Sequence, residues 1–300
     1  MNLVISLNKP KDITSQDAVT KVKKILKVKK AGHCGTLDPM ATGLLLICIN
    51  KATRLATYLS GSDKEYIAVM KLGESTDTQD AYGEILEKAD SIDVSEADIK
   101  AVLSLFKGKI SQLPPMFSAL KHKGKPLYEY ARQGIDIART SREVNIKSIE
   151  LLDFDLPFVK LKVACSKGTY IRTLCHDIGK KLGVGAHMTE LQRTAIGEFN
   201  LQDALEIDEL KELDITKTDN KAIHTLNSAL KHMPEFKITE NMVLSVSHGN
   251  AINIRQGLEL SDDIKTAQGI RILSPDNELL AVGRYGNERK IIKMDVVFAL

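Results

Sequence analysis

Residues 32–45, GHCGTLDPMATGLL, place a turn-rich segment directly before a hydrophobic run that continues to residue 49. Glycine and proline favour turns, and a short apolar run that follows turn residues is typical of a buried strand. The chain must therefore fold a compact loop against the edge of a core. Asp38 lies at the centre of this loop, so we expect the strand that follows to hold its carboxylate in a fixed place.

Several other segments have the period of a strand or a helix. Residues 3–7 and 66–72 are nearly continuous in apolar side chains and predict strands, with Tyr66 at the start of the second. Thr14 and Asp17 have the spacing of an N-terminal capping box, and apolar residues recur at helical spacing after them. From about residue 240 onward, short apolar runs alternate with turns, which predicts a small β-rich second domain.

Composition narrows the class of protein without identifying it. The net charge of +3 permits a polyanionic partner but does not require one. The four cysteines form no C-x-x-C pair, so we expect no metal site and a reducing compartment. The N-terminus lacks the features of a signal peptide, and no apolar run approaches the roughly 18 residues that span a membrane. We therefore expect a cytoplasmic protein.

Residues 113–142 interrupt this pattern with a basic insertion that opens on two prolines. Tyr128 and Tyr130 lie among its charges, against only two acidic residues. Basic side chains contact phosphates and tyrosines stack on bases, so the insertion suits RNA, although a polar surface hairpin would have the same composition. The candidate RNA-binding residues are Lys121, Lys123, Lys125, Arg132, Arg139 and Arg142.

Asp38 has two possible roles. An aspartate before a proline is usually a turn residue whose side chain bonds to nearby backbone amides. Arg172, however, lies at another junction between a predicted strand and a predicted helix, a common place for site residues, and Tyr66 could present its ring nearby. Burial raises the pKa of a carboxyl group and a neighbouring arginine lowers it, so an Asp38–Arg172 pair would keep a partly buried carboxylate ionised.

Four motifs resemble the TruB-type tRNA pseudouridine synthases, in the order of that family. Residues 32–45 resemble its catalytic signature, and SDKEYIA at 62–68 resembles its tyrosine motif. SKGTYIRTL at 166–174 resembles its arginine motif, and LQR at Leu191 matches a later leucine position. The NKP at residues 8–10 also matches. The four ordered motifs make the resemblance specific over residues 1–233, and the remainder matches more loosely.

The resemblance implies a particular reaction. Members convert uridine 55 in the T loop of tRNA to pseudouridine without a cofactor or a metal. By resemblance, Asp38 is the nucleophile, Tyr66 stacks on the flipped base, and Arg172 pairs with the nucleophile. Residues that match contacts to the target nucleotide are His33, Tyr66, Tyr170 and Leu191.

The same resemblance implies the architecture and partners. It predicts an α+β fold in which residues 1–233 form the pseudouridine synthase domain, with a mixed and largely antiparallel sheet. Residues 113–142 would be an RNA-clamping thumb, and residues 234–300 a small β-rich RNA-binding domain of PUA type. The expected partner is the T arm of tRNA, with no membrane and no protein partner required, and the chain is expected to be a monomer.

Three other functions compete with this one. A guide-RNA-dependent pseudouridine synthase would share the catalytic loop, but the thumb-like insertion favours the stand-alone type. A non-catalytic tRNA-binding or tRNA-folding protein would not need a buried carboxylate facing a polyanion. A phosphotransferase that uses an aspartate would need magnesium-binding acids near Asp38, and residues 32–45 contain no other acid.

Overall fold

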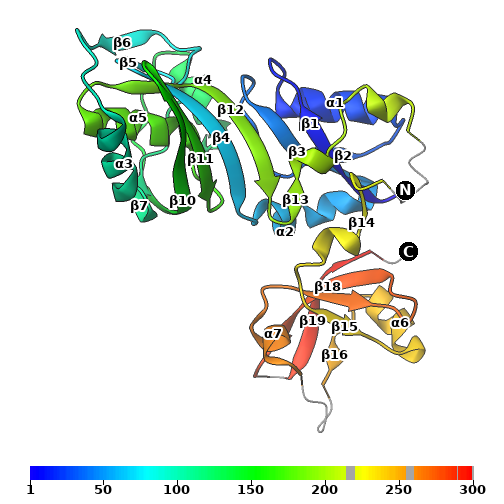
Figure 1. The fold of residues 1–300 in the computed structure, drawn as a ribbon. Helices are drawn as coiled ribbons and strands as arrows, with labels where there is room; N and C mark the ends of the chain where they lie inside the picture. Colours follow the sequence, from blue (N-terminus) through cyan, green and yellow to red (C-terminus); the bar gives the residue numbers. More distant parts are fainter. Residues whose placement is uncertain (214–219, 255–259, 289, 299–300) are drawn as a thin grey trace.

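A computed structural model describes residues 1–213, 220–254, 260–288 and 290–298 (Figure 1). Two main sheets organise these residues: a ten-stranded sheet in the N-terminal part and a five-stranded sheet in the C-terminal part. Helices pack around both sheets. The predicted α+β class, with a mixed sheet and a small β-rich C-terminal unit, is confirmed.

The large sheet has the order β14-β1-β3-β12-β4-β11-β10-β7, with β2 beside β3 and β13 beside β12. Its described pairs are antiparallel except β12 with β3, which run parallel where Gln192 faces Thr42 and Arg193 faces Gly43. The strands are β1 (Leu3–Lys9), β2 (Ala31–His33), β3 (Thr42–Ile49), β4 (Lys64–Leu72), β7 (Gly108–Gln112), β10 (Arg142–Asp155), β11 (Phe158–Cys165), β12 (Ala186–Ile196), β13 (Phe199–Asn200) and β14 (Ile223–Thr225).

Helices and two small hairpins surround this sheet. The hairpins are β5 (Glu74–Thr76) with β6 (Ile85–Lys88), and β8 (Lys121–His122) with β9 (Lys125–Pro126). The α-helices are α1 (Ser15–Ile25), α2 (Ala56–Ser60), α3 (Glu96–Leu105), α4 (Leu127–Ala131) and α5 (Ile171–Leu182). Short 3-10 helices are η1 (Asn50–Leu55), η2 (Leu201–Asp203), η3 (Glu209–Lys211) and η4 (Ser228–Leu230).

The predicted capping box starts helix α1. The Asp17 N–H donates to Thr14 Oγ1 at 3.0 Å, and the Thr14 N–H donates to the Asp17 carboxylate at 2.9 Å. These bonds satisfy amides that have no partner within the helix. Helix α1 then packs Val19 and Val22 onto the sheet. Its first residue, Ser15, is thereby fixed where it can reach the loop that carries Asp38.

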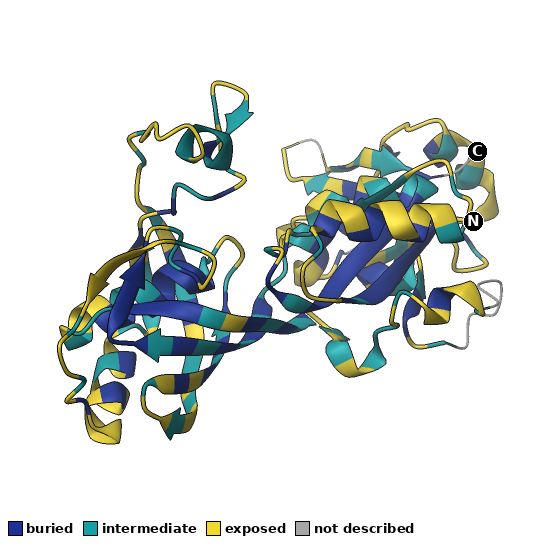
Figure 2. Cartoon of the chain, turned by 90° about the horizontal axis from the view of Figure 1, so that it is seen from above, coloured by how far each residue is buried: buried dark blue, intermediate teal, exposed yellow. Residues whose placement is uncertain are grey.

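Strand β3 is buried on both faces, as its apolar run predicts (Figure 2). Leu45 and Ile47 join the cluster beneath helix α1. Leu44 and Leu46 join a second cluster, which continues into the C-terminal unit. The loop before β3 is therefore anchored to the most completely buried strand of the large sheet, which limits its motion.

The C-terminal unit packs onto η1 and α2. Val282 and Phe298 extend the cluster that contains Leu44, and the ammonium group of Lys51 donates to the Phe298 carbonyl at 2.9 Å. The order of its sheet is β15-β17-β18-β19-β16. Its elements are β15 (Glu235–Lys237), α6 (Glu240–Ser247), β16 (Ile252–Asn253), α7 (Asp262–Thr266), β17 (Ile270–Leu273), β18 (Leu279–Gly286) and β19 (Ile291–Val297).

Gly43, at the end of the Asp38 loop, has no room for a side chain. Its φ is +102°, and a Cβ there would lie 2.4 Å from the Arg193 carbonyl oxygen. Gly43→Ala is expected to cost about 2–5 kcal/mol of stability, from left-handed strain plus overpacking. A thermal melt should show a fall in Tm of roughly 5–15 °C.

Gly183 provides the matched control for this substitution. It ends helix α5 in the left-handed conformation, φ +80°, and a Cβ there would meet nothing within 4 Å. Gly183→Ala should therefore cost only the backbone strain, about 1–2 kcal/mol. Equal losses of Tm for the two variants would mean that the contact of Gly43 with Arg193 does not matter.

Candidate active site

The loop between β2 and β3 is held from several directions. Ser15 Oγ accepts the Leu37 N–H at 2.8 Å and lies 3.0 Å from the Leu37 carbonyl oxygen, to which it donates. The Asp12 N–H donates to the Pro39 carbonyl at 2.8 Å, and the Ala41 N–H closes a turn onto the Asp38 carbonyl at 3.0 Å. Asp38 therefore projects from a constrained backbone.

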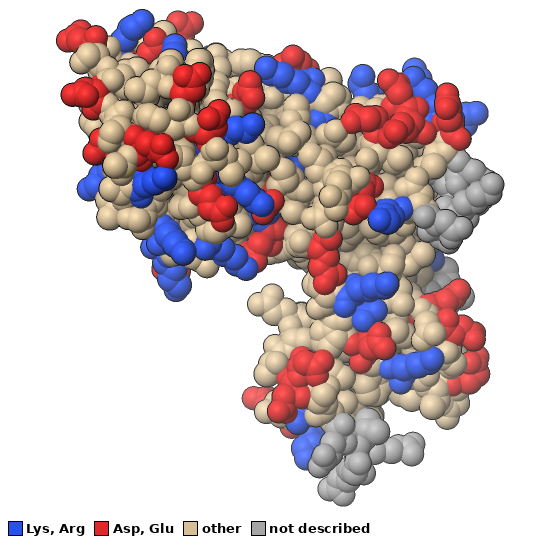
Figure 3. All heavy atoms as spheres, in the orientation of Figure 1, with Lys and Arg blue, Asp and Glu red and all other residues tan. Residues whose placement is uncertain are grey.

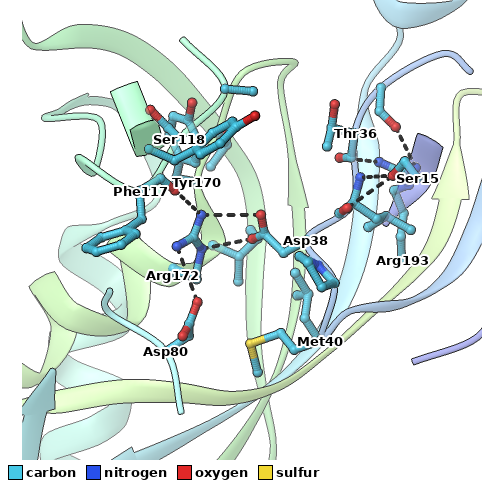
Figure 4. Close-up of a pocket in the computed structure, with 18 of the residues that line it drawn as sticks. Ser15, Thr36, Asp38, Met40, Asp80, Phe117, Ser118, Tyr170, Arg172 and Arg193 are labelled. Carbon is cyan, nitrogen blue, oxygen red and sulfur yellow. Dashed lines mark hydrogen bonds and ion pairs between the residues drawn. The ribbon is translucent and has the colours of Figure 1, made fainter. Parts of the chain in front are cut away.

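Arg172 pairs with this carboxylate. It lies in the first turn of α5, and its Nε is 2.8 Å from Asp38 Oδ2 while its Nη2 is 3.3 Å from Oδ1. The two side chains come from positions 134 residues apart. Figure 4 shows the guanidinium facing the carboxylate, with Asp80 beyond it. An arginine with two nitrogens on one carboxylate fixes its orientation as well as its charge.

Arg172 is itself held by other groups. Its Nη1 lies 3.2 Å from Asp80 Oδ2 and donates to the Thr78 carbonyl at 3.0 Å, and its Nη2 donates to the Phe117 carbonyl at 2.9 Å. Asp80 in turn accepts the Thr78 hydroxyl at 2.7 Å. The Arg172 side chain is 5% exposed, so these acceptors replace the water that its guanidinium has lost.

The remaining predicted substrate-contacting residues surround the same space. A cavity of about 960 Å³ opens at Asp38, which is large enough for a nucleotide. Tyr66, on β4, is 8% exposed, and Leu191, on the neighbouring strand β12, pairs with Ala68, two residues further along β4. Among the residues that line the cavity are His33, Asp38, Tyr66, Tyr170, Arg172 and Leu191.

The basic insertion lies partly over this cavity. Arg132 and Arg142 belong to its wall, and their guanidinium groups lie 5.4 Å and 4.7 Å from the ring centres of Tyr128 and Tyr170. Arg139 instead donates to the Pro114 carbonyl at 3.2 Å, so it holds the base of the insertion. The lysines Lys121, Lys123 and Lys125 lie on the β8–β9 hairpin and its turn.

Burial dominates the electrostatics of the site. Asp38 keeps 33% of its side-chain surface exposed, and its carboxylate lines the cavity. Burial raises the pKa of Asp38 above its ordinary 3.8, while Arg172 opposes the rise and Asp80 adds to it. Burial also raises the pKa of Tyr66, which keeps the phenol protonated at neutral pH.

The raised pKa of Asp38 makes a testable contribution to stability. The unfolded chain releases this proton near pH 3.8 and the folded chain only at higher pH, so the folded state loses stability as pH rises through that window. Asp38→Asn removes this loss. Its Tm relative to the parent should therefore increase between about pH 4 and the folded pKa, and then stay constant. Calorimetry over a pH series measures the difference.

Asp17 provides a control of opposite sign. Its hydrogen bonds with Thr14 lower its pKa, so its carboxylate stabilises the folded state above pH 3.8, and this contribution is lost as pH falls. The Tm of Asp17→Asn should therefore fall relative to that of the parent as pH rises. If the difference in Tm between Asp38→Asn and the parent changes with pH in the same direction as the difference for Asp17→Asn, the pKa of Asp38 is not raised in the folded protein.

Sequence reasoning missed three residues of the site. Asp80 lies in the acidic run TDTQDAYG, which does not differ visibly from an ordinary turn. Lys9 stands out in the sequence only as part of the NKP match. Its buried ammonium group donates to the carbonyls of Pro10 and Ile13 at 2.8 Å and of Pro39 at 3.3 Å. Arg193 follows Leu191 by two residues, and nothing in its sequence context indicates that it is fully buried.

The described part of the chain contains no group of three or more His, Cys, Asp or Glu side chains arranged to hold a metal ion. Within the same residues, no helix has the length and apolar character to cross a bilayer.

Solved structures identify the class of this fold. A Cbf5–Nop10–Gar1 complex contains a chain that matches 99% of this one with a TM-score of 0.74 and 32% identity, over 84% of its own length. A chain of an H/ACA RNP bound to a substrate RNA containing 2′-deoxyuridine matches 99% with a TM-score of 0.73 and 28% identity, over 85% of its length. The fold is that of the pseudouridine synthases related to TruB and Cbf5.

Sequence comparison gives the family. Residues 23–171 match the model of the TruB family pseudouridylate synthase N-terminal domain, and residues 172–234 match the tRNA pseudouridylate synthase B C-terminal domain. The tRNA pseudouridine synthase B of Clostridium tetani is 41% identical, and that of Clostridium acetobutylicum 43%; each alignment covers 98% of this chain and 99% of the relative. The chain belongs to the TruB family and is a tRNA pseudouridine synthase.

Proposed function

We propose that this enzyme isomerises uridine 55 in the T loop of tRNA, with Asp38 as the nucleophile. The observation that carries the proposal is the ion pair of Asp38 with Arg172, which fixes a carboxylate at the wall of a nucleotide-sized cavity. The choice of uridine 55 rests on the resemblance of the four motifs and on relatives that match over nearly the whole chain.

The proposed chemistry requires only groups that the cavity supplies. A carboxylate oxygen of Asp38 attacks the target nucleoside, the bond from N1 to C1′ breaks, and the base turns within the cavity. A bond then forms from C5 to C1′, the bond from the Asp38 oxygen to the nucleoside breaks to restore the carboxylate, the proton on C5 leaves to water, and N1 gains a proton, so the product is an isomer of the substrate. Arg172 keeps the carboxylate aimed, and such positioning supplies much of the barrier reduction.

The target base must leave its stack before it can reach Asp38. Extrusion costs a few kcal/mol, and stacking on the Tyr66 ring would return about 1–3 kcal/mol. Burial holds Tyr66 in place before RNA arrives, because the ring is 8% exposed and belongs to the main core cluster. We assign His33, Tyr170 and Leu191, which share the cavity, to contacts with the extruded nucleotide.

The basic insertion and the C-terminal unit are proposed to bind the rest of the T arm. Residues 113–142 carry six basic side chains, and Arg132 and Arg142 reach the cavity wall. Residues 234–300 would form a separate PUA-like domain after a catalytic domain of 1–233. Figure 3 shows acidic and basic side chains mixed over one face of the molecule, so charge alone does not direct RNA to that face.

We further propose that the enzyme works as a monomer in the cytoplasm, without a guide RNA or a partner protein. The decisive experiment uses purified protein alone and an unmodified T-arm stem-loop, labelled with tritium on C5 of uridine 55. Release of label to water reports the loss of the C5 proton. A stem-loop with cytidine at position 55 and the label on a neighbouring uridine tests the choice of position.

Stoichiometric release from the first RNA and none from the second supports the proposal. Release from the neighbouring uridine would refute the choice of position. No release despite tight binding would favour a guide-dependent enzyme or a tRNA-binding role, and the stand-alone activity would then be rejected.

A further inference from the structure

We propose that Arg193 is a positioning residue, which holds both ends of the Asp38 loop at a fixed distance from Tyr66. This inference deepens the proposed function, because it concerns how the same site keeps its nucleophile and its stacking ring in register. Arg193 is 1% exposed and ranks among the largest fully buried side chains of the described residues.

The guanidinium bonds to both sides of the loop. Its Nε donates to the Leu44 carbonyl at 2.7 Å, beyond the loop, and its Nη2 donates to the Gly35 carbonyl at 3.1 Å, before Asp38. Its Nη1 lies 3.5 Å from the Thr36 carbonyl oxygen. One side chain therefore ties together the segments before and after the loop that carries the nucleophile. Figure 4 shows Arg193 beside Thr36, at the start of this loop.

The backbone of Arg193 ties the same loop to Tyr66. Arg193 faces Gly43 across the parallel β12–β3 pair and faces Tyr66 across the antiparallel β12–β4 pair. The Arg193 charge also opposes the rise that burial causes in the pKa of the Tyr66 phenol. The Asp38 carboxylate and the Tyr66 ring are proposed to meet the target nucleotide from different sides. Contacts with Arg193 therefore set the distance between them.

A lysine cannot replace Arg193 in this arrangement. The planar fork reaches three carbonyls in three directions, whereas an ammonium group concentrates its donors on one atom. The surroundings also disfavour a lysine charge, since burial lowers the pKa of the neighbouring Lys9 and Lys64 to about 8. Arg193→Lys should therefore loosen the loop while it keeps the volume of the core nearly intact.

Arg271 offers a matched control in the C-terminal unit. It is also a buried arginine, whose Nε donates to the Met233 carbonyl at 3.0 Å and whose Nη1 donates to Asn227 at 2.6 Å. Arg271→Lys removes a comparable fork from the core without touching the Asp38 loop. Any general effect of exchanging a buried arginine for lysine appears in both variants, and a local effect only in Arg193→Lys.

The test has two readouts, one of which needs no RNA. Hydrogen exchange of the Leu37 and Ala41 amides, measured on the full chain, should speed up about tenfold in Arg193→Lys and stay unchanged in Arg271→Lys. Single-turnover release of C5 tritium from the T-arm stem-loop should fall about 100-fold in Arg193→Lys. Its Kd for the RNA should change less than about threefold, because the loss is in the chemical step.

Either of two results would overturn the role of Arg193: loop exchange equal to that of the parent, or a rate per folded molecule equal to that of Arg271→Lys. If the parent releases no label from the stem-loop while loop exchange still rises in Arg193→Lys, the choice of substrate is refuted and the holding role of Arg193 is supported.

Discussion

Asp38→Asn is expected to lower the single-turnover release of C5 tritium by about 10⁴-fold or more, while the RNA still binds. The carboxamide keeps the shape of the side chain and can still accept a hydrogen bond from Arg172, so the cavity should persist. It has no carboxylate oxygen with which to attack the nucleoside. The loss therefore belongs to the chemical step, and filter binding of the stem-loop should give a Kd close to that of the parent.

Asp177→Asn is the control for this loss. Asp177 lies on helix α5 beyond Arg172, and burial raises its pKa as it does that of Asp38. It is not among the residues that line the cavity. The control should keep the rate of the parent within about threefold. Measurable turnover by Asp38→Asn above one hundredth of the parent rate would exclude Asp38 as the nucleophile.

The local features of the fold could be predicted because their causes are local. The capping box of α1 needs only Thr14 and Asp17, three residues apart, and the end of α5 needs only a glycine that adopts a positive φ. Strand β3 follows from an unbroken apolar run. Each of these elements depends on side chains within one or two turns of the chain, so the sequence pattern is sufficient.

Asp38 and its partner Arg172 could be proposed from motifs, but the groups that hold them could not. Asp80 meets Arg172 across 92 positions, and Arg193 meets Gly35 across 158. Both contacts depend on strand order and register in the large sheet, where β12 lies between β3 and β4. An acidic turn and a single arginine carry no periodicity that would reveal this neighbourhood in advance.

Arg139 illustrates the same limit within the basic insertion. Composition groups it with Lys121 and Arg142 as a candidate contact to RNA. In the folded chain its guanidinium donates to the Pro114 carbonyl at 3.2 Å and pairs with Asp136 at 3.3 Å. Charge in a sequence thus indicates that an insertion can meet a polyanion, whereas the fold decides which of its cations are already engaged.

Arg172→Lys is expected to lower the single-turnover rate by roughly 10²–10³-fold and to destabilise the protein. The guanidinium currently serves both carboxylates, Asp38 and Asp80. A single ammonium group can approach one of them closely but cannot hold both in their present places. Asp80 is 6% exposed, so weakening its partner leaves a buried charge poorly compensated. A thermal melt measures the stability, and label release measures the rate.

Asp80→Asn separates the two roles of Arg172. This variant removes the distant carboxylate but leaves the contacts of Arg172 with Asp38 and with the Phe117 carbonyl. If Arg172 acts mainly by aiming Asp38, Asp80→Asn should lose only about tenfold in rate, well short of Arg172→Lys. If both variants lose the same factor, aiming requires the whole Asp38–Arg172–Asp80 chain, because Arg172 held from one side no longer fixes the Asp38 carboxylate.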